Sequence, residues 1–271
     1  MNDELPLGRS VPYPEQYSPE LLYEVPRAEH RAALNIGADL PFHGTDVWNA
    51  WELTWLDPMG LPMCATAEIL VPADSPSIIE SKSLKLYLNA FAMTHHASLE
   101  DVAETIEQDL SECSGADVDV KLSRLSSTDD LQVGRLPGES LDSLRIWCDA
   151  QAVDAGLLLA DPAEIVSEEL HSHLLRSLCP VTGQPDIGSV SIVYEGPKIA
   201  HEGLLRYIVS YRQHQGFHES CVERMFIDIM DRCKPENLTV YARYQRRGGI
   251  DINPFRSNFQ NDVPNTRLWR Q

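Results

Sequence analysis

Apolar residues recur along the chain with the spacing of strands and of helices in turn. Apolar and polar positions alternate over 51–55 and 118–122, and 64–71 is rich in β-forming residues, which predicts three strands. Between the second and third of these, apolar residues line one face of 84–91 and again of 102–110, which predicts two amphipathic helices.

The second half of the chain repeats that order. Strands are expected at 190–194 and 238–242, where apolar residues alternate, and helices at 204–209 and 222–233, where they fall on one face. Corresponding strands start roughly 120 residues apart, which favours two similar modules. Strands separated by a helix pair indicate an antiparallel α+β fold with the helices packed on one face of each sheet.

Composition marks four segments of the chain. Residues 1–45 hold six of the 18 prolines and show little periodicity, so we expect an extended N-terminal arm. The first module is expected over 46–125 and the second over 141–271. Between them, 126–140 is rich in Ser, Asp and Gly, as linkers are.

Charge limits the partners that the chain can bind. The 22 Lys and Arg residues against 41 Asp and Glu give a formal net charge of −19, which disfavours phosphate backbones and anionic lipid surfaces. We therefore expect neither nucleic acid nor a membrane as a partner. The start is acidic and has no apolar signal segment, and the six cysteines include no C-x-x-C pair, so reduced thiols in the cytoplasm are expected.

The common nucleotide-binding and hydrolase motifs are missing. The chain has no G-x-G-x-x-G, Walker A, G-x-S-x-G or H-E-x-x-H motif. The histidines at 95–96 and at 171 and 173 have no further ligand at metal spacing, so surface histidines are favoured over a metal site.

A first candidate for binding chemistry is 80–87, which reads E-S-K-S-L-K-L-Y. Backbone N–H groups at a helix start, together with Lys82 and Lys85, would bind an anion. The alternative, which the spacing alone favours, is a capped helix start with solvated lysines.

A second candidate is 178–186, which reads L-C-P-V-T-G-Q-P-D. Its prolines and glycine exclude a helix, so Cys179 is expected where helical sequence gives way to a stiff loop. Cys179 could act as a nucleophile with Asp186 as its acid–base partner. A buried structural cysteine beside a turn aspartate fits these residues equally well.

A third candidate combines 215–219 (Q-G-F-H-E) with 243–249 (R-Y-Q-R-R-G-G). The first stretch supplies a ring for stacking and, at a helix start, acceptors for an N–H edge. Arg243, Arg246 and Arg247 form the densest basic cluster of the chain, and with the two glycines they could bind a phosphate. The alternative is a hairpin turn in an alternating charged strand.

Together these segments resemble the NADPH-dependent 7-cyano-7-deazaguanine reductases, the nitrile reductases of queuosine biosynthesis. Segment 80–87 matches the signature of that family and 179–186 matches its catalytic loop, while 217–219 and 246–254 agree as well. Their order is that of the long, two-module form, and the resemblance covers most of the chain beyond the arm.

The resemblance implies two tandem tunnelling-fold (T-fold) modules, a homodimer, and NADPH bound without a Rossmann fingerprint. Zinc-binding members of the wider superfamily carry a Cys-x-x-His. Because Thr182 stands where that histidine would be, no metal is expected.

The resemblance also implies a role for each candidate residue. Cys179 would add to the nitrile carbon of 7-cyano-7-deazaguanine to give a covalent thioimide, with Asp186 as the proton donor. Two hydride transfers would then give 7-aminomethyl-7-deazaguanine. The implied contacts to the base are Phe217, His218 and Glu219 together with Ile79, Glu80 and Ser81, and those to NADPH are Ser81, Lys82, Arg247 and Gly248.

Two rival functions differ in what they require. A zinc-dependent, cyclohydrolase-like T-fold enzyme acting on a purine or pterin needs a bound metal. A non-catalytic purine-binding module would not consume NADPH when the nitrile is supplied.

Overall fold

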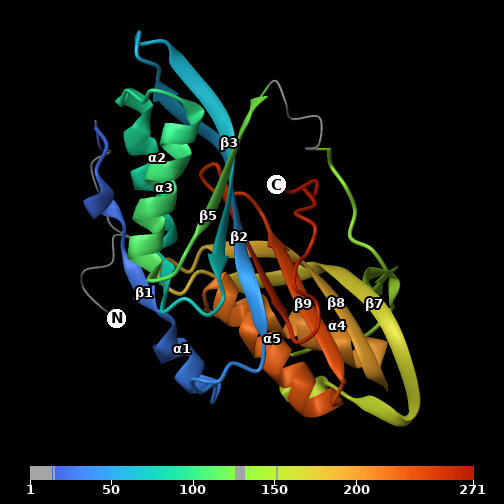
Figure 1. Cartoon of the computed structure of the whole chain (residues 1–271). Helices are drawn as coiled ribbons and strands as arrows, with labels where there is room; N and C mark the ends of the chain where they lie inside the picture. The colour runs from blue at the N-terminus through green and yellow to red at the C-terminus, as the bar shows by residue number, and fades with distance from the viewer. Residues whose placement is uncertain (1–13, 15, 126–131, 151) are drawn as a thin grey trace. The chain divides into compact units, whose positions relative to one another are not determined.

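The computed structural model describes residues 14, 16–125, 132–150 and 152–271, which fall into two compact units (Figure 1). The first unit comprises the described residues up to Ala32, with Asp46–Gln132 and Arg246–Asp251. The second comprises Ala33–Thr45, Val133–Gln245 and Ile252–Gln271. Among the described residues, no helix combines the length and apolar character that crossing a membrane requires.

The first unit combines two long helices with antiparallel strands. Along the sheet the order is β5-β3-β2, and β1 pairs with β4 separately. Helices α2 and α3 lie side by side in Figure 1. The elements are η1 (Pro19–Leu21), β1 (Glu24–Pro26), α1 (Arg27–Ala33), β2 (His43–Leu56), β3 (Pro62–Pro72), β4 (Ser77–Ile79), α2 (Ser81–Ala90), η2 (Phe91–Met93), α3 (Leu99–Ser114) and β5 (Asp119–Arg124).

Helix α3 shows how local sequence sets its boundaries. The Ser98 side chain accepts a hydrogen bond from the backbone N–H of Asp101, which caps the first turn. The helix ends at Gly115, whose left-handed φ of 74° suits glycine because it has no Cβ. Val102, Ile106 and Leu110 are fully buried, so the predicted apolar stripe is the packed face.

The second unit has a sheet in the order β10-β9-β8-β7-β6. Strands β7 and β8 form a long antiparallel hairpin, β9 pairs antiparallel with both β8 and β10, and the short β6 pairs parallel with β7. The elements are β6 (Glu139–Ser140), η4 (Leu141–Ser143), η5 (Ala155–Leu157), β7 (Ala160–Leu178), β8 (Pro185–Ile199), α4 (His201–Ser210), η6 (Tyr211–Gln213), α5 (His218–Cys233), β9 (Asn237–Tyr244) and β10 (Ile250–Ser257, in this unit from Ile252).

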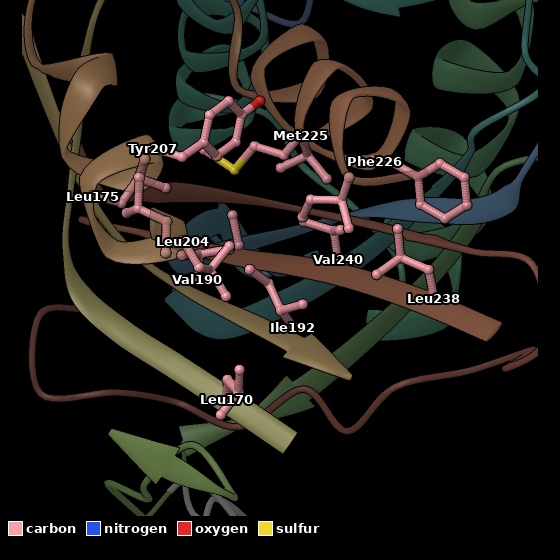
Figure 2. Packing of buried hydrophobic residues seen from close by; sticks show 14 of the residues in the cluster. Leu170, Leu175, Val190, Ile192, Leu204, Tyr207, Met225, Phe226, Leu238 and Val240 are labelled. Atoms are coloured by element: carbon pink, nitrogen blue, oxygen red, sulfur yellow. The ribbon is translucent and has the colours of Figure 1, made fainter. Parts of the chain in front are cut away.

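The core of the second unit lies between its two long helices and the strands β7, β8 and β9 (Figure 2). Leu204 of α4 and Phe226 of α5 belong to the same buried cluster as Val190, Ile192 and Val240 of the strands. Burying an aliphatic or aromatic side chain of this size contributes about 1.5–3 kcal/mol, so this layer holds the helices firmly on one face of the strands.

The sequence predicted the class and most of the elements correctly. The fold is mixed α+β with a large antiparallel sheet, and a strand or helix lies at each of the nine predicted positions. The predicted arm contains η1, β1 and α1. The predicted linker at 126–140 lies partly outside the described residues, and the module boundaries stay predictions.

One prediction about the site was wrong. Helical sequence was expected just before Cys179, but β7 extends to Leu178. Apolar residues in this stretch are spaced irregularly because the pairing of β7 with β8 shifts register between Ser172 and Leu175. Long-range pairing with β8 therefore decides the structure here.

Candidate active site

A closed hairpin loop between β7 and β8 carries Cys179. The Cys179 N–H donates to the Gln184 carbonyl at 2.9 Å, and the Gly183 N–H donates to the Cys179 carbonyl at 3.0 Å. Gly183 has a left-handed φ of 66°, a conformation that side chains with a Cβ disfavour. Cys179 is itself buried, so the loop holds this thiol in a defined place rather than on a mobile tip.

Asp186 lies at the same end of this hairpin. It is the second residue of β8 and is paired with Ser177, two residues before Cys179. Its side chain is buried, and its Oδ2 atom lies 3.4 Å from Nε2 of His218. The structure thus brings a carboxylate and an imidazole together at the end of the hairpin that carries the cysteine.

His218 begins helix α5, and its ring is held between two neighbours. The ring of Tyr244 stacks on it with centroids 3.7 Å apart and an angle of 6° between the planes. On the other ring nitrogen, Nδ1 is buried and has no hydrogen-bond partner within the described part of the chain. A buried polar atom in that state is costly, and it is typical of a site that receives a ligand or water.

Glu219 follows His218 in the first turn of α5. Its side chain is 3% exposed. The N-terminal end of a helix favours a carboxylate, because unpaired N–H groups give that end a partial positive charge. Phe217 is the residue that precedes the helix and is half-buried. The three predicted base contacts of this segment are therefore consecutive residues at one helix start.

Cys221 follows in the same helix, three residues after His218. Burial, together with the negative charge of Glu219, raises the pKa of the Cys221 thiol to about 12. Thiolate is the nucleophilic form, so a raised pKa disfavours Cys221 as a nucleophile at neutral pH. The neighbouring hydroxyl groups of Ser177 and Tyr244 are fully buried as well. The sequence had singled out none of these three residues for the site, although Tyr244 lies within the third candidate segment.

In the first unit, Glu80 caps helix α2. Its two carboxylate oxygens accept the backbone N–H groups of Lys82 and Ser83, each at 2.8 Å, and the residue is completely buried. These N–H groups were expected to bind an external anion, but the chain's own carboxylate already occupies them. The capped helix start is thus what the structure contains. Ile79 ends β4 just before this cap and is buried as well.

Lys85 of α2 lies beside the turn that contains Gly248. A Cβ atom on Gly248 would come within 3.2 Å of Cδ of Lys85, and Gly248 has a left-handed φ of 61°. A hollow of about 230 Å³ opens here, lined by Lys85, Asn89, Gly248 and Gly249 among others. Two predicted parts of a phosphate site, the lysine helix and the glycine turn, therefore meet within the first unit.

Arg243, which belongs to the basic cluster in the sequence, lies in strand β9. Arg243 is completely buried, and its guanidinium group donates to Gln271, Tyr241 and Asn265. It is a structural residue of β9, so the expectation that it could help to bind a phosphate was wrong. Burial of an arginine by distant partners leaves no local sequence signal.

The histidine pairs singled out in the sequence have ordinary partners. Nδ1 of His95 contacts the Asp57 carbonyl at 2.8 Å, and Nδ1 of His173 contacts the Ser189 hydroxyl at 2.7 Å. In the part of the chain that the structure describes, no three His, Cys, Asp or Glu side chains are arranged to hold a metal ion.

The second unit therefore has a buried cysteine in the hairpin loop and, at the same end of the hairpin, a buried carboxylate in contact with an imidazole. Two protein-family models match the chain. Residues 13–122 match the model described as "Nitrile reductase, 7-cyano-7-deazaguanine-reductase N-term", and residues 185–262 match "QueF-like protein".

Curated relatives match over nearly the whole length. The NADPH-dependent 7-cyano-7-deazaguanine reductase of Paraburkholderia phytofirmans is 54% identical over 271 residues, covering 99% of both chains. The protein of the same name from Burkholderia ambifaria is 53% identical over 274 residues, covering 100% of both. This chain belongs to the family of NADPH-dependent 7-cyano-7-deazaguanine reductases.

Among solved structures, the archaeosine synthase QueF-Like in the apo form aligns with 37% of this chain and 96% of its own. The identity is 20% and the TM-score 0.31, so this similarity supports no conclusion.

Proposed function

We propose that this chain reduces the nitrile group of 7-cyano-7-deazaguanine to the primary amine of 7-aminomethyl-7-deazaguanine, with NADPH, in queuosine biosynthesis. Family membership supports the reaction. The observation that carries the mechanism is the hairpin end, where Cys179 is held in a closed loop and Asp186 lies 3.4 Å from His218.

The first step adds the Cys179 thiol across the carbon–nitrogen triple bond. Sulfur bonds to the nitrile carbon, the Asp186–His218 pair takes the thiol proton, and Asp186 delivers a proton to the nitrogen. The product is a thioimide, formed without a leaving group. Covalent attachment fixes the carbon in one position, which removes much of the entropic cost of the later steps.

When bound, NADPH would supply one hydride to that carbon in each of two rounds, four electrons in total. Between the rounds the carbon–sulfur bond breaks, the Cys179 thiol is restored and an imine remains. In this proposal Asp186 and His218 return a proton to sulfur and to nitrogen as charge develops there. Burial of the carboxylate keeps bulk water from competing for these protons.

The first unit offers residues that fit NADPH. Lys85 and Gly248 line the same hollow, and Lys82, Ser81 and Arg247 are their sequence neighbours. Lysine and arginine suit the phosphate groups, and a glycine lets backbone N–H groups approach them. We propose Ser81, Lys82, Arg247 and Gly248 as the cofactor contacts.

Recognition of the base is proposed for Phe217, His218 and Glu219. A carboxylate accepts two hydrogen bonds side by side, which matches the N–H and NH₂ edge of a guanine-like base. The ring of Phe217 offers a stacking face. Ile79, Glu80 and Ser81 are proposed as further contacts, and Glu80 can accept more bonds because each of its oxygens has a second lone pair.

We also propose that the two modules are tunnelling folds and that the chain acts as a homodimer. The presence of two long helices and antiparallel strands in each unit supports the first proposal. Sedimentation at several protein concentrations tests the second.

The test of the function is NADPH absorbance with the purified chain. With 7-cyano-7-deazaguanine, two NADPH should be consumed for each amine formed, and a chelator should change nothing. Turnover that needs zinc and no NADPH would instead favour the hydrolase, and tight binding of the base without any turnover would favour a binding module.

A further inference from the structure

The side chain of Gln271 is buried against β9 and β10, and every polar atom of its amide is used. Its Oε1 accepts from Nε of Arg243 at 3.1 Å and from Nη2 of the same guanidinium at 2.9 Å, and also from the Leu268 N–H at 3.0 Å. Its Nε2 donates to Oδ1 of Asn253 at 2.8 Å and to the Tyr244 carbonyl at 3.3 Å. Most glutamines are exposed, so an amide bound on all sides points to a specific purpose.

The two groups that receive the Nε2 bonds converge on Tyr244. Asn253 uses the same Oδ1 atom to accept the Tyr244 N–H at 3.2 Å. The backbone of Tyr244 is thus reached on its carbonyl side by Gln271 and on its N–H side through Asn253. These bonds fix the last residue of β9, from which the aromatic ring projects.

The ring of Tyr244 in turn fixes the plane of His218. The two rings stack at 3.7 Å with 6° between their planes. Since Nδ1 of His218 has no hydrogen-bond partner in the described chain, no bond at that atom sets the plane of the imidazole. The stack and the 3.4 Å contact of Nε2 with Asp186 both restrain this ring.

We propose that Gln271 is a positioning residue for the His218–Asp186 pair, and that it acts through the Tyr244 ring. The inference rests on the proposed function for its effect on turnover, but the geometric coupling stands by itself. Gln271 touches neither His218 nor Asp186. Loss of its amide frees the end of β9, the Tyr244 ring tilts, and the imidazole no longer holds its angle to the carboxylate.

The geometric part is tested by the NMR signals of the His218 ring protons, assigned by comparison with a His218→Asn protein. A tyrosine ring face-to-face at this distance displaces these signals strongly upfield. In Gln271→Ala we expect them to move most of the way toward those of an unstacked histidine. Trp269→Ala is the matched control, because Trp269 is 69% exposed and its ring packs against the Arg270 guanidinium.

A second pair of variants separates positioning from folding. Tyr244→Phe keeps the ring and should retain the upfield signals, whereas Tyr244→Leu removes the stack and should lose them. This pair also decides the coupling of Tyr244 to His218 if Gln271→Ala proves too unstable to study.

On turnover, we expect Gln271→Ala and Tyr244→Leu to lower kcat by roughly tenfold, well within what a misplacement of about 1 Å costs. KM for NADPH should stay unchanged. Unmoved His218 signals in folded Gln271→Ala, or moved signals with unchanged kcat, would overturn the proposal. If the unmodified protein fails to reduce the nitrile, the proposed function fails, while the NMR comparison still decides the coupling.

Discussion

The hairpin between β2 and β3 and the hairpin between β7 and β8 close in the same way. In the first, the Asp57 N–H donates to the Leu61 carbonyl at 2.9 Å; in the second, the Cys179 N–H donates to the Gln184 carbonyl, also at 2.9 Å. In both loops a proline follows the residue that donates this N–H, Pro58 after Asp57 and Pro180 after Cys179. Asp57 in the first unit therefore occupies the place that Cys179 has in the second.

The surroundings of the two loops match as well. The residue before each loop donates its N–H to the segment that follows a short 3₁₀ turn, Leu56 to Thr94 at 2.9 Å and Leu178 to His214 at 2.8 Å. Helices α2 and α4 each have ten residues, and α3 and α5 each have sixteen.

A hydrogen bond from a buried tyrosine to a half-buried aspartate also recurs between the helices of each unit. The Tyr87 hydroxyl donates to Asp109 and the Tyr207 hydroxyl to Asp228, both at 2.6 Å. The framework is thus present twice, whereas Cys179 and Asp186 have no counterparts in the first unit. Where β8 begins with a proline and then Asp186, β3 begins with a proline and then Met63. Packing and backbone hydrogen bonds are enough to maintain the fold in both units. The fold itself therefore does not require the cysteine or the aspartate.

The largest effect is expected from exchanging the loop residues themselves. Cys179→Ala should abolish NADPH consumption with the nitrile, because no other group can form the thioimide. Adding Asp57→Cys to that variant should not restore it, since Met63 cannot supply a proton. NADPH absorbance measures both, and recovered turnover in the double variant would mean that the first hairpin can also act as a site.

The second largest effect on turnover is expected from replacing Asp186. Asp186→Asn keeps the size of the side chain but removes the proton, and we expect kcat to fall about 100-fold, a usual range for lost acid–base catalysis. Circular dichroism should show an unchanged fold. Near-normal kcat in the folded variant would assign the proton donor to another group.

The two helix starts give a third contrast. Glu219 and Glu100 are both the second residue of a sixteen-residue helix, but Glu219 is buried and Glu100 is exposed. Glu219→Leu should weaken binding of the base more than tenfold, because unpaired donors of the ligand cost about 1–3 kcal/mol each. Calorimetry with Glu100→Leu as the control measures it. Equal affinities in the two variants would remove Glu219 from the site.

The smallest effect concerns stability. Helix α2 is capped by the Glu80 carboxylate, whereas Ala200 at the start of α4 makes no such bond. Glu80→Ala should cost about 0.5–2 kcal/mol in the free energy of unfolding, and Ala200→Ser should gain up to about 1 kcal/mol. Urea unfolding with far-ultraviolet detection measures both changes. A stabilised Glu80→Ala protein would show that the cap is strained rather than favourable.

Patterns of local origin could be predicted from the sequence. The apolar stripe of α3 and its Ser98 cap depend on neighbouring residues, and the stiff loop after Leu178 follows from its prolines and glycine. The cysteine, the carboxylate and the 217–219 group were also identified there, although their roles remain proposals.

What the sequence could not show arises from distant contacts. Strand β1 exists because Glu24 pairs with Ile79, and β7 continues to Leu178 because it pairs with β8. Burial of Arg243 depends on Gln271. Composition and periodicity describe only near neighbours, so these features were missed or misjudged.

The most direct test of the central claim, that Cys179 forms the covalent intermediate, is intact-protein mass spectrometry with the nitrile in the absence of NADPH. Without hydride the reaction should stop at the thioimide. The protein should then gain the mass of the whole substrate, and peptide mapping should place it on Cys179. Burial raises the pKa of the Cys221 thiol to about 12 and that of Cys233 to about 11, so neither should react at neutral pH. No adduct on an active enzyme, or an adduct on Cys221 or Cys233, would contradict the account.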